Sequence, residues 1–287
     1  MEKINNGIIE LTTSNIGCEF QSIKYKEKEY LWNGDSTIWK FRSPMLFPIV
    51  GFLKDNECFI DGKRYEMPVN HGFGKLASYK VISLTNNEVK YELTSSEETL
   101  KEYPYEFVLH VTYKLENNQI KVIWNVLNKS NKTMYYHIGA HTGFSLRLND
   151  DDKTSDYYLE LDEPKKLNIF EFANNLTGDK HPFKEDAIQQ INFEEEIKKH
   201  GVVILENVSN VTLKSHRHNH SVRLDFEKLP LIGLWHPQME DCPFVCLEPW
   251  HGIMDNKNTD KNFLNKAFLI SLKPNESYET GYTITLN

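Results

Sequence analysis

The stretch Phe107-Val108-Leu109-His110-Val111-Thr112-Tyr113 alternates apolar and polar residues, and a second alternating stretch, residues 119–127, follows the polar pair Asn117-Asn118. Alternation of this kind is typical of a β-strand that buries one face. Two such stretches joined by a short asparagine turn predict an antiparallel hairpin.

Short strand-like runs bounded by turn residues recur on both sides of this hairpin. Asp61-Gly62 and Asn86-Asn87 are tight-turn signals between such runs. Helical signals are confined to three short stretches, residues 95–100 with Ser95 or Ser96 as N-cap, residues 193–199 and residues 258–265. Strands spaced this regularly, with few helices, predict an all-β sandwich or barrel. Because no linker or composition break interrupts the pattern, residues 1–287 are expected to form one domain.

Composition excludes several classes of protein. The formal net charge of −8 argues against a nucleic-acid binder, which needs a basic stripe. No apolar run is long enough to cross a bilayer, and the polar N-terminal residues predict no signal peptide. The four cysteines are too few for a disulfide framework and lack the spacing of a zinc site, so a reduced, cytoplasmic protein is expected: Cys18, Cys58, Cys242 and Cys246.

One carboxylate follows an apolar run in Pro243-Phe244-Val245-Cys246-Leu247-Glu248-Pro249-Trp250-His251-Gly252. Phe244 and Val245 favour a buried strand, and Pro249, which has no N–H, is expected to end it. Burial beside aromatic rings raises the pKa of a carboxyl group, which suits a general base near neutral pH. The alternative is a structural Glu248 that accepts hydrogen bonds from the backbone at a strand end.

Two histidines lie among small residues. His71, in Asn70-His71-Gly72-Phe73-Gly74, is expected on a loop after a hairpin, either as a functional residue or as a half-buried side chain bonded to the backbone. His141, in Gly139-Ala140-His141-Thr142-Gly143, has neighbours that let a ligand approach its ring, and histidine titrates near neutral pH. His137, on the preceding strand, is expected to be packed and hydrogen-bonded.

A third group of histidines lies in Ser215-His216-Arg217-His218-Asn219-His220. On a strand, alternate histidines share one face, an arrangement that suggests a metal site. No acidic or cysteine ligand is close in the sequence, so a solvent-facing polar strand or loop is the preferred interpretation, and no metal is predicted.

Four short motifs then occur in a fixed order: Ser43-Pro44-Met45-Leu46-Phe47-Pro48-Ile49-Val50-Gly51, Asn70-His71-Gly72-Phe73, Gly139-Ala140-His141 and Glu248-Pro249-Trp250. Together they resemble the aldose 1-epimerase (galactose mutarotase) family, and most nearly its bacterial branch associated with lactose-utilisation operons. The resemblance covers nearly the whole chain. It implies a galactose mutarotase-like β-supersandwich, in which large antiparallel sheets pack on each other and a sugar lies in an open cleft.

The resemblance also implies a mechanism. Glu248 would take the proton of the anomeric hydroxyl, His141 would protonate the ring oxygen, and His71 would bind the sugar and stabilise charge near that oxygen. The acid and the base are expected on opposite sides of the sugar ring, and neither a metal nor a cofactor is implied. The substrate-binding residues expected on this basis are Asn70, Phe52, Lys54, Trp235, His236 and Trp250.

Some of these residues mark departures from the family motifs. Phe52 follows Gly51 where the family has an arginine that binds sugar hydroxyls, and Arg42 or Lys54 is expected as a substitute. Thr142 stands where the second histidine motif has a proline. His236 is a stand-in for a family aspartate that contacts sugar hydroxyls.

The predicted function is therefore an isomerase of the aldose 1-epimerase (mutarotase) type, acting on a free hexose, with a small-molecule sugar as its partner. Two alternatives remain: a non-catalytic or regulatory carbohydrate-binding protein on the same scaffold, and a hexose-6-phosphate 1-epimerase. The last would need basic side chains around the cleft, for which the sequence offers Arg42, Lys54, Lys75 and Arg217. Exposed sheet edges are compatible with a monomer or a homodimer.

Overall fold

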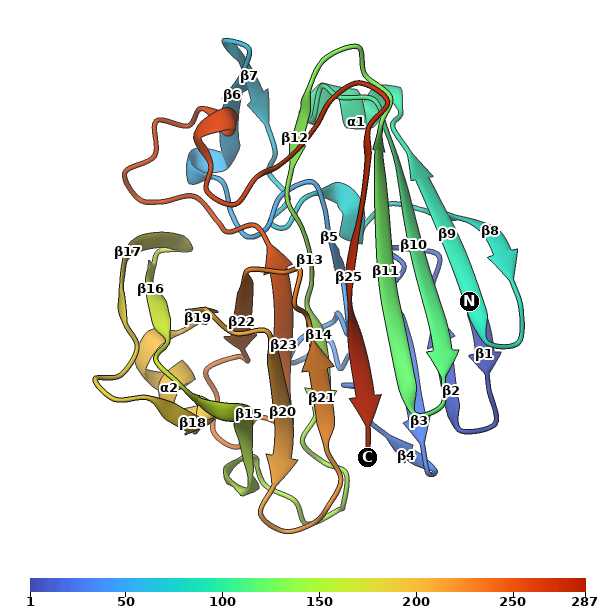
Figure 1. Ribbon diagram of the computed structural model, residues 1–287, viewed down its shortest axis with the longest axis vertical. Coiled ribbons are helices and arrows are strands. Elements are labelled where there is room, and N and C mark those ends of the chain that lie inside the picture. The colour runs from blue at the N-terminus through green and yellow to red at the C-terminus, as the bar shows by residue number, and fades with distance from the viewer.

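The computed structural model describes residues 1–287 and consists mainly of antiparallel strands (Figure 1). Its largest sheet has nine strands, in the spatial order β18 (Ile188–Ile191), β15 (Tyr157–Lys165), β20 (Asn210–Ser215), β21 (Val222–Asp225), β25 (Ser277–Leu286), β11 (Gln119–Asn128), β10 (Phe107–Glu116), β9 (Glu88–Thr94) and β8 (Lys80–Leu84). The predicted hairpin is confirmed as β10–β11, and it lies inside this sheet between β9 and β25.

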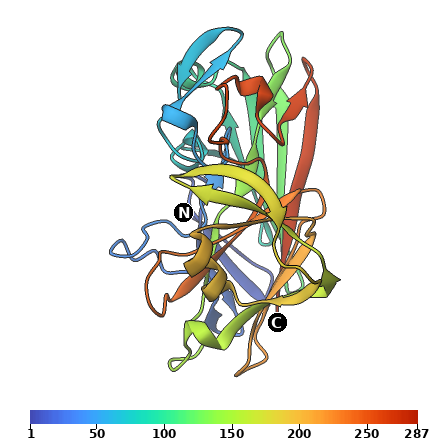
Figure 2. The same ribbon diagram turned by 90° about the vertical axis from the view of Figure 1, so that its left-hand side faces the viewer.

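A second sheet of eight strands carries the regions of interest for function. Its path runs β17 (Leu176–Pro182), β16 (Asn168–Ala173), β19 (Val203–Glu206), β22 (Leu231–Trp235), β23 (Phe244–His251), β13 (Ile138–Ala140) and β5 (Met45–Leu46), and β14 (Thr142–Ser145) also pairs with β23. The first two of these strands form a hairpin at the sheet edge, which lies at one side of the molecule in Figure 1 and faces the viewer in Figure 2.

Smaller sheets complete the strand set. A four-stranded sheet contains β1 (Glu2–Asn5), β2 (Ile9–Thr13), β3 (Phe20–Tyr25) and β4 (Lys28–Glu29). Two further pairs are β12 (Met134–Tyr136) with β24 (Ile270–Leu272), and β6 (Glu57–Ile60) with β7 (Lys63–Glu66). The β6–β7 turn is the predicted one, because Asp61 and Gly62 both have positive φ angles, 52° and 75°, as a two-residue hairpin turn requires.

Helices are few and short, as predicted. Helix α1 (Glu97–Glu102) begins after Ser96, whose hydroxyl accepts a hydrogen bond from the Thr99 amide, and α2 (Phe193–His200) occupies the second predicted stretch. The third stretch, residues 258–265, is mostly loop and ends in a single 3₁₀ turn. The 3₁₀ turns are η1 (Lys54–Asn56), η2 (Phe73–Lys75), η3 (Thr154–Asp156) and η4 (Phe263–Asn265). No helix is long and apolar enough to cross a membrane.

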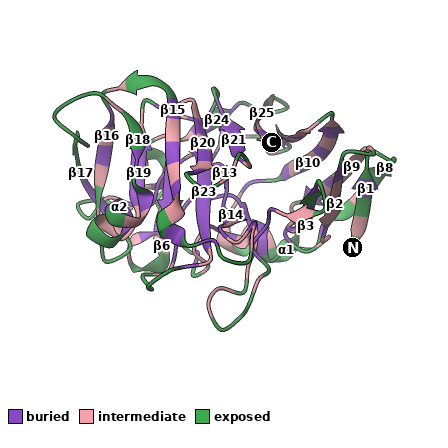
Figure 3. Ribbon diagram, turned by 90° about the horizontal axis from the view of Figure 1, so that it is seen from below, coloured by how far each residue is buried: buried purple, intermediate pink, exposed green.

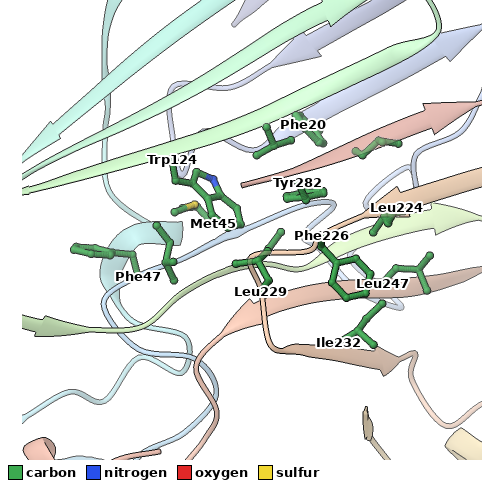
Figure 4. Packing of buried hydrophobic residues seen from close by; sticks show 14 of the residues in the cluster. Phe20, Met45, Phe47, Trp124, Leu224, Phe226, Leu229, Ile232, Leu247 and Tyr282 are labelled. Atoms are coloured by element: carbon green, nitrogen blue, oxygen red, sulfur yellow. The ribbon is translucent and has the colours of Figure 1, made fainter. Parts of the chain in front are cut away.

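One cluster of 66 buried hydrophobic residues draws members from the nine-, eight- and four-stranded sheets. Figure 4 shows Trp124 and Tyr282 of the nine-stranded sheet near Leu247 and Ile232 of the eight-stranded sheet. In Figure 3 the buried residues follow the inner strands, such as β23, whereas exposed residues gather in the loops and at the outer strands. The fold is the all-β supersandwich of antiparallel sheets that was expected.

Alternation along β23 separates this core from the opposite face of the eight-stranded sheet. Val245 and Leu247 belong to the large core cluster. Successive side chains of a strand point to opposite faces, so Cys246, Glu248 and Trp250 point away from that core. These three side chains form part of a second face of the sheet, and the candidate site lies on that face.

Candidate active site

Strand β23 is the structural centre of the site because it pairs on both sides. On one side β22 pairs with it continuously, and Ile232 is opposite Pro249. On the other side the ladder is shared by two strands, since Thr142 of β14 is opposite Leu247 and Gly139 of β13 is opposite Trp250. The same register, continued across the gap between β13 and β14, places His141 opposite Glu248.

The prediction that Pro249 ends the strand was wrong, because β23 continues to His251. Proline has no N–H to donate, so a ladder that includes it loses a hydrogen bond at that point. In β23 this interruption lies on the side that pairs with β14 and β13, at the point between those two strands. The sequence therefore places a gap in the ladder beside Glu248, and His141 lies at this gap.

His141 and Glu248 are in direct contact, with His141 Nε2 lying 3.3 Å from Glu248 Oε2. Both side chains are largely buried, and burial raises the pKa of Glu248 well above its usual value. Burial, together with the charge of Lys75, lowers the pKa of His141 to about 3. The alternative of a structural glutamate lacks its main requirement, since no backbone N–H donates to the Glu248 carboxylate.

His71 is held by the early Ser43–Gly51 motif. The His71 amide donates to the Gly51 carbonyl at 2.7 Å, and the Gly51 amide donates to His71 Nδ1 at 3.0 Å. Because Nδ1 accepts this bond, the neutral ring carries its proton on Nε2, which is then the donor available to a ligand. His71 also has a positive φ of 63°, a strained backbone conformation that is common at functional sites. Burial, with smaller contributions from His141 and Lys75, lowers its pKa well below the usual value.

Aromatic rings surround His141. Trp39 stacks on it with 5.0 Å between ring centroids, Trp235 meets it edge-on at 5.5 Å, and His71 meets it edge-on at 5.3 Å. These contacts fix the ring plane of His141 and limit the water that reaches it. A fixed ring beside a buried carboxylate is suited to transferring protons at a defined position.

A cleft of about 530 Å³ opens over this pair. Seven of the nine sequence-predicted site residues line it: His71, His141, Glu248, Asn70, Phe52, Trp235 and Trp250. They come from three separated parts of the chain, and the strand register explains why two of them, His141 and Glu248, meet.

Two predicted binding residues lie outside the lining of the cleft. The ammonium of Lys54 donates to the Lys257 carbonyl at 2.8 Å. His236 is fully buried, and its Nδ1 lies 2.7 Å from the Pro237 carbonyl. His236 directly follows Trp235, the last residue of β22, and it is enclosed by the protein and does not line the cleft, so it does not replace the family aspartate there. Arg42 is also absent from the lining, since its guanidinium donates to Gln21.

Lys75 is the one lysine or arginine that lines the cleft. It is 8% exposed, forms no ion pair, and donates to Asn70 Oδ1 at 2.7 Å. Burial, and to a lesser extent Lys40, lowers its pKa to about 8. Of the four basic residues considered for a sugar phosphate, only Lys75 is in place, because Arg217 pairs with Asp151 and Asp156 elsewhere.

Sequence reasoning missed several lining residues, chiefly the aromatic pair Trp39 and Phe41 and the wall formed by Phe172 and Asn175. Trp39 and Phe41 are aromatic residues that follow the polar residues 33–37, and this contrast could have indicated that they line a binding site. The wall lies on the β16–β17 hairpin, which was not predicted. Its turn is Asn174-Asn175, with φ angles of 53° and 64°, the same dipeptide that marked two other turns.

Trp250 spans two strands because the residues beside it are glycines. A Cβ atom at Gly233 would lie 2.5 Å from the indole, and one at Gly139 would lie 2.7 Å from it. The indole N–H donates to the Ala140 carbonyl at 3.2 Å. The two glycines thus allow the indole to lie flat against the sheet below the cleft.

Four other histidines that the sequence singled out lie outside the lining of the cleft. His137 is buried and its Nε2 lies 2.9 Å from the Ala267 carbonyl, as expected for a packed residue. Strand β20 ends at Ser215, so the three histidines after it do not share a strand face. His216 stacks on Tyr158. His218 contacts Asp152 and His220 contacts Tyr30, and these two histidine rings lie 5.1 Å apart.

The sequence model of the aldose 1-epimerase family matches residues 3–285. The chain belongs to the aldose 1-epimerase family. This confirms the resemblance expected from the four motifs.

Relatives of this aldose 1-epimerase family member match it over its whole length. The plasmid and chromosomal forms of protein LacX from Lactococcus lactis subsp. lactis are each 28% identical over 298 residues, covering 99% of this chain and 98% of the relative. A galactose mutarotase related enzyme from Lactobacillus acidophilus has a TM-score of 0.93 at 28% identity and covers 100% of this chain and 97% of its own. A galactose mutarotase-like protein from Lactobacillus casei has a TM-score of 0.92 at 28% identity, with full coverage of both chains.

The structure shows what occupies the two positions at which this aldose 1-epimerase family member departs from the motifs. Phe52 lines the cleft in place of the arginine. Thr142 is fully buried and shares a 2.7 Å hydrogen bond with the Ser43 hydroxyl. Thr142 therefore links the second histidine motif to the start of the early motif, and it lies beneath the site rather than in it.

Proposed function

We propose that this protein is an aldose 1-epimerase that interconverts the α and β anomers of a free hexose. The observation that carries the proposal is the His141–Glu248 pair, in contact at 3.3 Å on the floor of a cleft of about 530 Å³. This volume lies within the range of small-molecule sites. Apolar rings beside a few directed polar groups are also the usual lining of such sites.

The proposed reaction begins with ring opening. Glu248 takes the proton of the anomeric hydroxyl, His141 gives a proton to the ring oxygen, and the bond between that oxygen and the anomeric carbon breaks. The resulting aldehyde rotates, and the reverse proton transfers close the ring as the other anomer. The acid and the base lie side by side instead of on opposite sides of the sugar. This arrangement is adequate, because the anomeric oxygen and the ring oxygen are bonded to the same carbon.

Burial favours the direction of ring opening. The step converts a charged pair, imidazolium and carboxylate, into a neutral pair, imidazole and carboxylic acid. Burial raises the pKa of Glu248 and lowers the pKa of His141, so both effects stabilise the neutral pair, which is the resting state of the free site. The charged pair that starts ring opening forms when the Glu248 proton passes to His141 across their 3.3 Å contact, and ring opening then restores the neutral pair. In the same step, His71 Nε2–H is available to donate to the sugar and to stabilise negative charge on the ring oxygen.

The test is anomer exchange on freshly dissolved α-glucose and α-galactose, followed by polarimetry or saturation-transfer NMR. We expect exchange faster than the buffer control, and a loss of about 10²-fold or more in Glu248→Gln, since general acid–base groups contribute 10²–10⁴-fold. Glu92→Gln is the matched control, because Glu92 is a half-buried glutamate paired with His110 outside the cleft. Unchanged exchange in Glu248→Gln would overturn the mechanism, and no acceleration with any sugar that binds would favour the carbohydrate-binding alternative.

Lys75 favours a second candidate, epimerisation of a hexose 6-phosphate. A buried ammonium without an acidic partner in a ligand cleft is suited to an anionic substrate. Comparing glucose with glucose 6-phosphate separates the two candidates. If the phosphate is the substrate, Lys75→Met lowers kcat/KM for glucose 6-phosphate about tenfold or more, the usual effect of removing a hydrogen bond to a charged group. Equal exchange of both sugars would contradict the second candidate.

We place this activity in the cytoplasm. The four cysteines are all buried and free of disulfides, which suits a reducing compartment. Cell fractionation checks the assignment, and recovery of the protein from the culture medium would contradict it.

A further inference from the structure

We propose that His141, Cys246 and Glu248 form an inhibitory site for a soft or borderline divalent cation such as Zn²⁺ or Cd²⁺. The donor atoms of these three residues lie within 4.8 Å of one another. All three side chains are largely buried, and none forms a hydrogen bond with the backbone. The His141 and Glu248 side chains contact each other, and the Cys246 thiol has no hydrogen-bond partner.

Strand geometry brings the three side chains together. Cys246 and Glu248 are two residues apart on β23 and therefore point to the same face of the sheet. His141 lies opposite Glu248 across the gap between β13 and β14. Opposite Cys246 on that side is Gly143, which has no side chain to separate the thiol from the imidazole.

The donor set fits the proposed cation. Imidazole nitrogen, thiolate sulfur and carboxylate oxygen are the three ligand types that Zn²⁺ takes, with bond lengths of about 2.0–2.3 Å that put tetrahedral ligands roughly 3.3–3.8 Å apart. A modest contraction of the cluster meets this spacing, and a water or a sugar oxygen in the cleft completes the tetrahedron. Thiolate and carboxylate together balance the two positive charges. Mg²⁺, which prefers oxygen ligands and octahedral geometry, does not fit.

His141 Nδ1 is buried and has no hydrogen-bond partner. Metal-bound histidines usually donate the second ring N–H to another group, and here that group is lacking. This predicts a site of moderate affinity, loaded and emptied by changes in metal concentration. On binding, the Cys246 thiol forms a bond to the metal and releases its proton to solvent.

The consequence for the site is inhibition. A cation held by His141 and Glu248 occupies the nitrogen and the oxygen that would exchange protons with the sugar. Metal binding itself is independent of the proposed function, whereas inhibition of anomer exchange rests on it.

The experiment is calorimetric titration of the chelator-treated protein, under thiol-free reducing conditions, with Zn²⁺, Cd²⁺ and Mg²⁺. We expect about one equivalent of Zn²⁺ or Cd²⁺ to bind, Mg²⁺ not to bind, and Cys246→Ser to weaken Zn²⁺ binding at least about tenfold. Cys242→Ser is the matched control, because Cys242 is equally buried but lies outside the cluster, and it should bind Zn²⁺ as the unaltered protein does.

Unaltered Zn²⁺ affinity in Cys246→Ser, or no binding to the unaltered protein, would overturn the proposal. If Cys246→Ser fails to fold, X-ray absorption of the zinc-loaded unaltered protein tests the proposal. One sulfur ligand beside nitrogen and oxygen ligands is expected, and a shell of nitrogen and oxygen alone would contradict the proposal. Anomer exchange measured in parallel separates the two proposals. If zinc binds through Cys246 but the protein does not accelerate anomer exchange, the metal site is supported and the epimerase function is contradicted. If the protein accelerates exchange and zinc does not inhibit it, the epimerase function is supported and the inhibitory site is contradicted.

Discussion

At the residue scale, the proposed role of His141 in proton transfer can be separated from a role in binding. His141→Asn keeps a polar side chain among the three rings but removes the group that is proposed to protonate the ring oxygen. We expect kcat to fall about 10²-fold or more while KM changes little, because the lost interaction is made mainly in the transition state. Steady-state anomer exchange measures both constants. A variant that loses affinity while kcat is preserved would assign His141 to binding alone.

Glu248 also makes stability depend on pH. Its folded-state pKa is raised above its usual value of 4.5, so below pH 4.5 the carboxyl group is protonated in both the folded and the unfolded chain and its burial does not lower stability. Above that pH the unfolded chain ionises first, and stability falls by about 1.4 kcal/mol per pH unit until the folded pKa is reached. Glu248→Gln should therefore be more stable than the unaltered protein at neutral pH, and equally stable below pH 4.5.

Urea denaturation of both proteins at the two pH values checks this. The lowered pKa of His141 makes a contribution of its own, which is lost as pH falls below 6.5, but it is shared by both proteins and largely cancels in the difference. A stability difference that does not change with pH would mean that burial does not perturb Glu248.

The sequence predicted the catalytic candidates better than the binding residues. His71, His141 and Glu248 each stand out locally, through neighbouring glycines or an apolar run that ends in a charge. The prediction of Lys54 and His236 rests only on their position along the chain, and neither lines the cleft. The direction of a long or buried side chain depends on partners such as the Lys257 and Pro237 carbonyls, which no local pattern reveals.

At the scale of the element, Gly233 determines how closely Trp250 approaches β22. Gly233→Ala would place a methyl group 2.5 Å from the indole. We expect a loss of about 1–3 kcal/mol in the free energy of unfolding, the usual cost of overpacking a buried site. The double variant with Trp250→Phe is the control, because a smaller ring leaves room for the methyl group.

Chemical denaturation of the two single variants and the double variant measures the coupling. Gly233→Ala should cost less in the Trp250→Phe background than in the unaltered protein. Equal costs in both backgrounds would show that the alanine destabilises β22 for a reason other than the indole.

Hairpins could be predicted where turn residues were flanked on both sides by clear strand patterns. Asp61-Gly62 and Asn117-Asn118 stand between clear strands, and both turns are present. The turn Asn174-Asn175 was overlooked because β17 contains a glycine and a proline and is largely exposed, so the run shows no buried face. Edge strands of this kind show little alternation of apolar and polar residues. Their conformation depends on the strands with which they pair, which the local sequence does not reveal.

At the scale of the whole molecule, the shared core predicts cooperative unfolding. The cluster of 66 buried residues joins the large sheets, so the loss of one sheet exposes apolar surface of the other. We expect a single heat-absorption peak in scanning calorimetry, with calorimetric and van't Hoff enthalpies that agree, as the expectation of one domain requires. Two resolved peaks would divide the chain into separate folding units.

The order of strands in the sheets lay beyond local sequence reasoning. Gln119 pairs with Thr285, and Asn5 hydrogen-bonds Asn86 through their backbones, across long sequence separations. Many strand orders satisfy the same alternation of apolar and polar residues. The supersandwich was therefore predicted from the family resemblance, whereas strand spacing alone indicated only an all-β protein.

The β16–β17 hairpin forms one wall of the cleft, and its sequence can change without disturbing the rest of the fold. It lies at the edge of the eight-stranded sheet, and most residues of its strands are half-buried or exposed, yet Phe172 and Asn175 reach the cleft. Substitutions there are expected to change what the cleft admits at little cost to folding. Glu248, on β23, and His141, between β13 and β14, lie in a buried part of the sheet that cannot vary so freely. Substitutions in this one hairpin can thus alter ligand preference without changing the proposed proton-transfer pair, His141 and Glu248.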